Sequence, residues 1–189
     1  MPAEIPEERI FEAAIDTVLE RGYTGATTKQ IAEAAGISEM TLFRRFGTKD
    51  KLLRAALTFE AAKFIGEAIA YTGDVQTDLE RVVRTYNRLL KKRGRIALEL
   101  IAELPRRPEL REVARIPQEA MVEIAALVGR YQREGKLQGN SPWQATLELL
   151  GPVFVINALK SVNPLLPASV DPRAVVERYL AGWGSQATA

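Results

Sequence analysis

The sequence predicts an all-α protein, and two observations carry this prediction. Apolar residues recur every three to four positions from residue 7 to residue 183, as in amphipathic helices, and no segment alternates like a half-buried strand. The breaks between these segments hold helix-boundary residues, with Ser, Thr or Asp before a helix and Gly or Pro after it. The 189 residues are enough for a small head and one larger helical body.

The first part of the chain predicts three short helices and one longer helix. Their expected ranges are residues 7–21, 27–35, 39–46 and 49–71. Glycines end the short helices at Gly22, Gly36 and Gly47. Thr27 is an N-cap with Gln30 in the capping-box position, and Ser38 and Thr48 cap the next two helices.

The rest of the chain predicts five more helices, so that six helices follow the head. Their expected ranges are residues 79–94, 95–104, 108–135, 142–162 and 172–183. Gly94 separates the first two, Pro108 begins the third, and Pro117 should kink or break it. We therefore expect a three-helix head over residues 1–50 and a six-helix body over residues 51–189.

The absence of cysteine and histidine excludes several classes of function. The chain has no disulfide framework, no zinc site of the usual kind, and no histidine base for a Ser or Cys nucleophile. It also lacks a glycine-rich phosphate loop. We predict a protein that is not an enzyme and uses no cofactor or metal. An enzyme that works with carboxylates, Lys or Tyr is the alternative.

Neither the N-terminus nor the most apolar segment predicts a membrane protein. The first 14 residues are acidic and amphipathic, unlike a signal peptide. Residues 149–159 are too few to span a bilayer, and they include Pro152 and Asn157. This pattern predicts a buried helix in a soluble, cytoplasmic protein.

Residues 27–53 contain the most informative pattern, which is two short helices joined by a tight turn. A helix-turn-helix needs small residues where its helices cross, a glycine in the turn, and apolar anchors beneath. These requirements are met by Ala32, Ala35, Gly36, Ile37, Leu42 and Phe46. The second helix of such a motif enters the major groove of duplex DNA.

Basic residues gather on the same segment. Between Thr41 and Lys51, four bases accompany a single acid, Asp50; the bases are Arg44, Arg45, Lys49 and Lys51. The charged residues among the first 26 are mostly acidic, and the whole chain has a net charge of only +2. A local basic face in a nearly neutral chain is expected where a protein contacts phosphate.

The segment resembles the N-terminal domain of the TetR family of one-component transcriptional regulators. The family signature G-[IV]-S-x-x-T-L-Y-x-x-F-x-[ST]-K-x-x-L matches residues 36–52, GISEMTLFRRFGTKDKL, without a gap. The resemblance covers roughly residues 7–60. It implies a homodimer that binds a palindromic operator, most simply as a repressor, and that releases DNA when a small-molecule inducer enters its body.

The resemblance also assigns DNA contacts. The residues implied to contact phosphate are Thr28, Lys29, Arg45 and Lys49. Of these, Thr28 and Lys29 could also reach a base edge. The residues implied to face the major groove are Glu39, Met40, Thr41 and Arg44. Phe43 stands where the family usually has Tyr, so the hydroxyl contact to phosphate is lost and ring packing remains.

Glu39 stands where a Lys or a polar residue is common, and two roles are open to it. Its carboxylate could accept a hydrogen bond from a cytosine amino group, or it could cap its own helix. An acid at the DNA face also keeps a rival hypothesis open. In that hypothesis the chain is a helical protein–protein adaptor that has lost DNA binding.

The body predicts a site for a small, largely apolar ligand. Apolar stripes with a few polar groups are typical of small-molecule sites. The expected contacts are Tyr86, Met121, Phe154 and Asn157. Asn157 could bind the ligand or could form a hydrogen bond within the chain or across a dimer. The run Lys91, Lys92 and Arg93, together with Arg95, is interpreted as a solvated helix end, with an anionic ligand as the alternative.

The last two helices predict the dimer interface. Residues 147–162 are apolar on all sides, and the final helix adds a second stripe, which is more apolar surface than one small body can bury. The expected contacts are Leu147, Val155, Val176, Tyr179 and Trp183. A symmetric pair would bury this surface.

Overall fold

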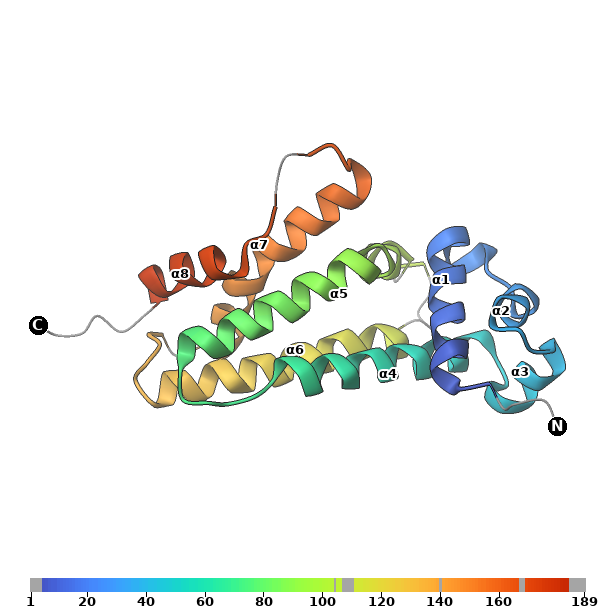
Figure 1. Ribbon diagram of the computed structural model, residues 1–189, viewed down its shortest axis with the longest axis horizontal. Coiled ribbons are helices and arrows are strands. Elements are labelled where there is room, and N and C mark those ends of the chain that lie inside the picture. Colours follow the sequence, from blue (N-terminus) through green and yellow to red (C-terminus); the bar gives the residue numbers. More distant parts are fainter. Residues whose placement is uncertain (1–4, 104, 107–110, 140, 167–168, 184–189) are drawn as a thin grey trace, which may run out of the picture. The chain divides into compact units, whose positions relative to one another are not determined.

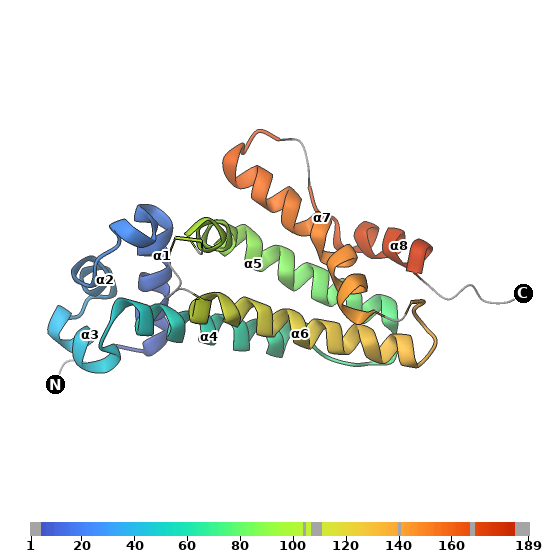
Figure 2. The ribbon, with the colours of Figure 1, turned by 180° about the vertical axis from the view of Figure 1, so that it is seen from behind.

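The computed structural model describes residues 5–103, 105–106, 111–139, 141–166 and 169–183 (Figure 1). These residues form eight α-helices, which confirms the predicted all-α class. The helices are α1 Glu7–Gly25, α2 Thr28–Ala35, α3 Glu39–Phe46, α4 Lys49–Ala68, α5 Val75–Glu103, α6 Arg111–Arg133, α7 Pro142–Val162 and α8 Pro172–Trp183. Figure 2 shows the same helices from behind.

The chain packs as two compact units, which we call unit 1 and unit 2. Unit 1 comprises Met1–Ala62 and Arg95–Pro117, and unit 2 comprises Lys63–Gly94 and Gln118–Ala189. Each unit has its own hydrophobic core. The expected division after residue 50 separates a head from a body by function, whereas these units are defined by packing. That division stays a prediction.

The core of unit 1 holds the helix-turn-helix together. α2 packs against both α1 and α3. The large side chains that are fully buried there are Ile10, Ile15, Ile31, Leu42, Leu52 and Leu53. Since the undersides of α2 and α3 are fixed in this core, the orientation of their opposite, exposed faces is fixed as well.

Helix boundaries in unit 1 follow the local sequence signals. Gly22 is non-helical, with φ 71° and ψ 162°, although a further turn carries α1 on to Gly25. Thr27 and Gln30 form the predicted capping box, with the Gln30 amide donating to the Thr27 hydroxyl at 3.3 Å. Gly36 ends α2 in the left-handed conformation that glycine adopts without strain.

The core of unit 2 is built from the end of α4 and the inward faces of α5, α6, α7 and α8. The most deeply buried side chains larger than alanine are Leu79, Val82, Val83, Ile124, Val128, Tyr131, Leu149, Leu150, Val153 and Val176. The apolar residues that recur at helical spacing along α5 and α6 thus face this core. α7 also packs directly against α8.

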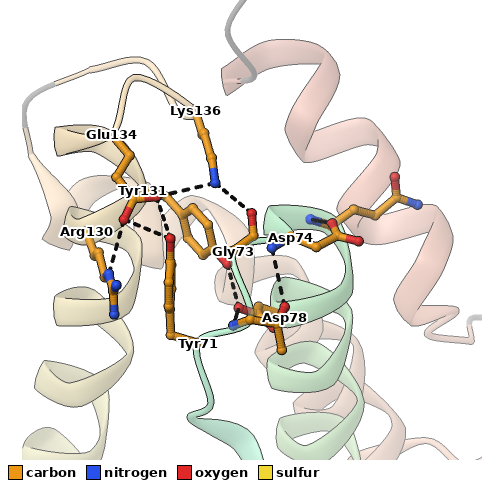
Figure 3. A network of polar contacts seen from close by, with 10 residues as sticks. Tyr71, Gly73, Asp74, Asp78, Arg130, Tyr131, Glu134 and Lys136 are labelled. Atoms are coloured by element: carbon orange, nitrogen blue, oxygen red, sulfur yellow. Dashed lines mark hydrogen bonds and ion pairs between the residues drawn. The ribbon is translucent and has the colours of Figure 1, made fainter.

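A polar cluster in unit 2 joins the loop before α5 to the end of α6 (Figure 3). At its centre the fully buried Asp78 carboxylate accepts hydrogen bonds from the Tyr131 hydroxyl at 2.5 Å and from the Thr72 amide and hydroxyl, each at 2.8 Å. The Arg81 guanidinium forms an ion pair with the same carboxylate. We call Thr72, Asp78, Arg81 and Tyr131 the Asp78 clasp.

A second set of contacts, which is exposed, lies beside the Asp78 clasp. The Tyr71 hydroxyl donates to the Glu134 carboxylate at 2.7 Å, and the Arg130 guanidinium lies 3.2 Å from the centre of the Tyr71 ring. The Lys136 ammonium donates to the Gly73 carbonyl at 2.6 Å (Figure 3). These contacts tie the same loop to α6 a second time.

The structure differs from the sequence prediction at Gly94. α5 runs without interruption from Val75 to Glu103, so five helices follow the head in the described residues, instead of six. A glycine inside a helix costs only about 1 kcal/mol, which does not end a helix that tertiary packing supports. α6 continues through Pro117, so the helix does not break there, and the alternative of a kink stays a prediction. Pro108 lies outside the described residues.

α7 was predicted to be a buried helix, but only one face of it is buried. Leu149 and Val153 lie in the core of unit 2, whereas Leu147 and Val155 are exposed. By length and composition, α7 is also the one helix of the described chain that could cross a membrane. Of its most apolar 18-residue stretch, 33% is buried. The fold therefore leaves a long apolar helix face uncovered.

Candidate nucleic-acid interface

The start of α3 is fixed by its cap and by the turn before it. The Ser38 hydroxyl accepts from the Thr41 amide at 3.1 Å and also lies 2.8 Å from the Thr41 hydroxyl. In the turn, the Ile37 amide donates to the Ala32 carbonyl at 3.0 Å. Leu42 is fully buried beneath the helix. These contacts determine which face of α3 is directed outward.

The outward face of α3 combines two large apolar side chains and one base. Met40 is 81% exposed and Phe43 is 65% exposed, and Arg44 is exposed beside them. Their spacing of three and four positions places all three on one side of the helix, opposite Leu42. Within the described chain Arg44 makes no hydrogen bond or ion pair. This face is therefore available to an external partner.

The start of α2 supplies a second exposed base. Lys29 is exposed and, like Arg44, has no hydrogen bond or ion pair within the described chain. It follows Thr28, the first residue of α2, where backbone amides are unsatisfied and favour an anion. Both features suit a phosphate contact, which stays a prediction for this residue.

Glu39 has a partner that the sequence did not indicate. Its carboxylate accepts a hydrogen bond from the Thr28 hydroxyl at 2.6 Å, which links the first residue of α3 to the first residue of α2. Ser38, not Glu39, caps α3. While this bond exists, the Thr28 hydroxyl cannot also donate to a phosphate. A contact between Glu39 and cytosine stays a prediction.

Two of the predicted phosphate contacts are engaged inside unit 1. Arg45 forms an ion pair with Glu7 at 2.9 Å. The Lys49 ammonium donates to the Ala26 carbonyl at 3.0 Å and lies 4.2 Å from the centre of the Tyr23 ring. Contact with phosphate would have to share or replace these interactions. The assignments of Arg45 and Lys49 stay predictions.

Sequence reasoning missed the residues that hold these two bases. Glu7 is 38 positions from Arg45, and Tyr23 is 26 positions from Lys49. No local pattern pairs residues so far apart. Only the packing of α1 against the rest of unit 1 brings them together.

The four predicted ligand contacts all belong to unit 2. Tyr86, Met121 and Phe154 are half-buried against its core, and burial raises the pKa of the Tyr86 hydroxyl to about 12. The Asn157 amide donates to the Asn87 side-chain oxygen at 2.9 Å and to the Val153 carbonyl at 2.8 Å. Among the roles open to Asn157, the structure therefore shows the hydrogen bond within the chain. The assignment of all four residues as ligand contacts stays a prediction.

The basic run at residues 91–93 is only partly a solvated helix end. Lys91 and Lys92 are exposed as expected, but Arg93 is only 5% exposed. The prediction was wrong for Arg93 because the run lies inside α5, which continues to Glu103, and Arg93 is on the inward face of that helix. The side chain of Arg95 lies outside the described residues. The periodicity of α5, once extended past Gly94, would have indicated this.

The predicted dimer contacts divide into two groups. Leu147 and Val155 on α7 are 48% and 52% exposed. Val176 and Tyr179 on α8 are buried in the core of their own unit and have almost no surface left for a partner. The side chain of Trp183 lies outside the described residues. Further exposed apolar side chains follow the same face of α7, namely Trp143, Leu159 and Val162.

Comparison with known proteins places these features in one family. Residues 10–56 match the family model of bacterial regulatory proteins, tetR family. The HTH-type transcriptional regulator YvkB of Bacillus subtilis is 40% identical over 73 residues, which is 38% of each chain. The HTH-type transcriptional repressor AcnR of Corynebacterium efficiens is 36% identical over 69 residues, which is 36% of each chain. These two matches thus span little more than a third of either relative.

A longer match extends the likeness. The HTH-type transcriptional regulator BetI of Brucella canis is 30% identical over 142 residues, covering 56% of this chain and 72% of BetI. Solved structures share the fold across nearly the whole chain. A transcriptional regulator from Rhodococcus sp. Rha1 has a TM-score of 0.72 at 20% identity and covers 94% of this chain and 97% of its own. The flavonoid-responsive regulator FrrA has a TM-score of 0.65 at 19% identity, with 96% and 98% covered.

Proposed function

This chain belongs to the TetR family of DNA-binding transcriptional regulators, and we propose that it is a repressor that acts as a homodimer. In this proposal residues 1–50 bind a palindromic operator, and residues 51–189 form the ligand-binding and dimerisation domain. A small, largely apolar compound binds the body and releases the operator. The protein works in the cytoplasm.

The outward face of α3 is the observation that carries DNA recognition. An exposed arginine without a partner inside the described chain is suited to a bidentate contact with guanine, which is the commonest specific base contact. Lys29 is placed at the start of α2, where a phosphate would also meet backbone amides. Base reading by Arg44 and backbone contact by Lys29 together give both specificity and affinity.

The exposed face of α7 supports the homodimer. Trp143, Leu147, Val155, Leu159 and Val162 recur at helical spacing along about five turns. A contiguous apolar surface of this kind normally marks an interface. Two copies related by a two-fold axis would each bury this face against the other, and a dimeric DNA-binding protein of this symmetry reads a palindromic site.

Unit 2 supports a ligand of apolar character. Tyr86, Met121 and Phe154 are apolar or aromatic and only half-buried, so surface remains on each for a further contact. FrrA, which shares the fold, is a flavonoid-responsive regulator. A ligand that binds one of two arrangements of the dimer more tightly would shift the population away from the DNA-binding arrangement.

A DNA selection experiment tests the function. Full-length protein is incubated with a random duplex pool at low salt, and the retained sequences are compared over successive rounds. The proposal expects one enriched inverted repeat, and light scattering is expected to give the mass of a dimer at micromolar concentration. A chain that retains no DNA at low salt would instead support the adaptor hypothesis.

A reporter assay tests repression. The enriched site is placed over a promoter, and expression is compared with and without the protein. AcnR is named a repressor, which favours repression for this chain as well. Increased transcription in the presence of the protein would identify an activator and contradict this part of the proposal.

A further inference from the structure

The apolar side chains on α3 are not explained by the fold. Met40 and Phe43 are the two exposed large apolar side chains of the helix-turn-helix, and neither belongs to the core of unit 1. Both lie on the face that also carries Arg44, away from the buried Leu42. A helix of eight residues thus directs two apolar groups outward at the position where the proposed function puts DNA.

The chemistry of the major groove limits what these groups can contact. Base edges there present hydrogen-bond donors and acceptors, and the only apolar group is the C5-methyl of thymine. Met40 has no hydrogen-bond donor, and its thioether is only a weak acceptor. Phe43 has no hydroxyl and therefore cannot donate to phosphate.

We propose that Met40 and Phe43 read thymine through its C5-methyl group, so that each half-site holds thymines at fixed positions beside the base pair read by Arg44. This inference rests on the proposed DNA-binding function. Met40 and Phe43 are three positions apart, so they face successive parts of the groove and read different thymines. The methyl groups bury apolar surface that is exposed in the free protein.

Replacement of thymine by deoxyuridine tests the inference directly. Deoxyuridine keeps the base pair and the O4 acceptor and lacks only the methyl group. The site enriched from the random pool is synthesised with each thymine of one half-site replaced in turn, and binding is measured by fluorescence anisotropy. We expect an affinity loss of about fourfold at each thymine that is read, the effect of one methyl group removed from apolar contact.

Two variants assign the thymines to their side chains. Met40→Ala should bind the intact site more weakly and should lose its discrimination between thymine and deoxyuridine at one position, while keeping it at the other. Phe43→Ala should show the opposite pattern. Because both side chains are exposed, the thermal unfolding of each variant should match that of the wild type.

Val122→Ala is the matched control, since Val122 is an exposed apolar residue of α6 outside the helix-turn-helix. It should keep full discrimination. The ratio of thymine to deoxyuridine affinity should also be the same at low and high salt, because the phosphate contribution is common to both DNAs.

Three outcomes would overturn the inference. In the first, no replacement of thymine by deoxyuridine weakens binding to the enriched site. In the second, both alanine variants still discriminate between thymine and deoxyuridine at every position. Both would leave the proposed function intact. The third is a random pool without any enriched sequence, which overturns the proposed function and the inference with it.

Discussion

The Asp78 clasp and the outward face of α3 use charge in opposite ways. Asp78 is fully buried, and each interaction of its carboxylate is with its own chain. Arg44 is exposed and has no hydrogen bond or ion pair within the described chain. A buried charge must be paired if the fold is to be stable, whereas a charge that recognises a partner has to be left available. Substitutions in the clasp should therefore affect stability, and substitutions on α3 should affect binding.

The largest effect is expected for Asp78→Ala. It leaves the buried Tyr131 hydroxyl and the Arg81 guanidinium without their acceptor, and breaking such a buried pair costs about 3–5 kcal/mol. Urea unfolding followed by circular dichroism would measure the loss. Glu177→Ala, which removes an exposed ion pair with Arg173, is the control and should change stability far less. Equal losses in the two variants would show that the clasp is not a stabilising element.

Arg44→Ala should cost about 1–3 kcal/mol of operator binding and relax the preference at one base pair per half-site. Its unfolding should stay close to wild type, because the side chain has no partner in the described chain. Binding isotherms on the enriched site and on random DNA would measure both effects. A loss that is equal on the two DNAs would make Arg44 a phosphate contact instead of a base reader.

Lys29→Ala is the matched comparison for Arg44→Ala. It should weaken binding to the enriched site and to random DNA alike. It should also lower the slope of log affinity against log salt by about one. Lys49 is less suitable for this comparison, because its ammonium also holds the Ala26 carbonyl and packs on Tyr23. A change in base preference with Lys29→Ala would contradict its assignment to phosphate.

Phe43→Tyr should strengthen binding by about 0.5–1.5 kcal/mol, the net value of one hydrogen bond. The added hydroxyl restores the donor that the family usually has at this position, and its phosphate partner is the same on any sequence. The gain should therefore appear on enriched and random DNA alike, in the same isotherms. Weaker binding would indicate that the ring lies where a hydroxyl cannot be accommodated.

The smallest effect is expected for the dependence of stability on pH. Burial alone would raise the pKa of Asp78, but the hydrogen bonds from Tyr131 and Thr72 and the Arg81 contact outweigh it and lower the pKa below its ordinary value. The contribution of the ionised Asp78 carboxylate to the free energy of unfolding is therefore complete above its ordinary pKa of about 3.9. It is lost as the pH falls through the lower folded-state pKa. The stability difference between wild type and Asp78→Asn should stay constant from neutral pH down to about 5. It should shrink only under strong acid, and a difference that shrinks near neutral pH would contradict the lowered pKa.

The sequence by itself determined where the head helices begin and end and which motif they form. Caps such as Thr27 and Ser38 and the turn residue Gly36 act on backbone groups within about four positions, so their effect can be deduced from the residues next to them. The signature over residues 36–52 is likewise a contiguous pattern. The all-α class follows from the same local rules.

Only the tertiary structure decided which face of each helix in the body is buried. α7 is apolar on nearly all sides, so its pattern could not indicate that Leu149 and Val153 face the core, although Leu147 was expected to face a partner. On α8, Val176 and Tyr179 were assigned to a partner subunit but lie in the core of their own unit. Asn157 meets Asn87 across 70 positions. Pairings of this kind depend on which helices pack together, because burial is a property of the assembled core and not of any one segment.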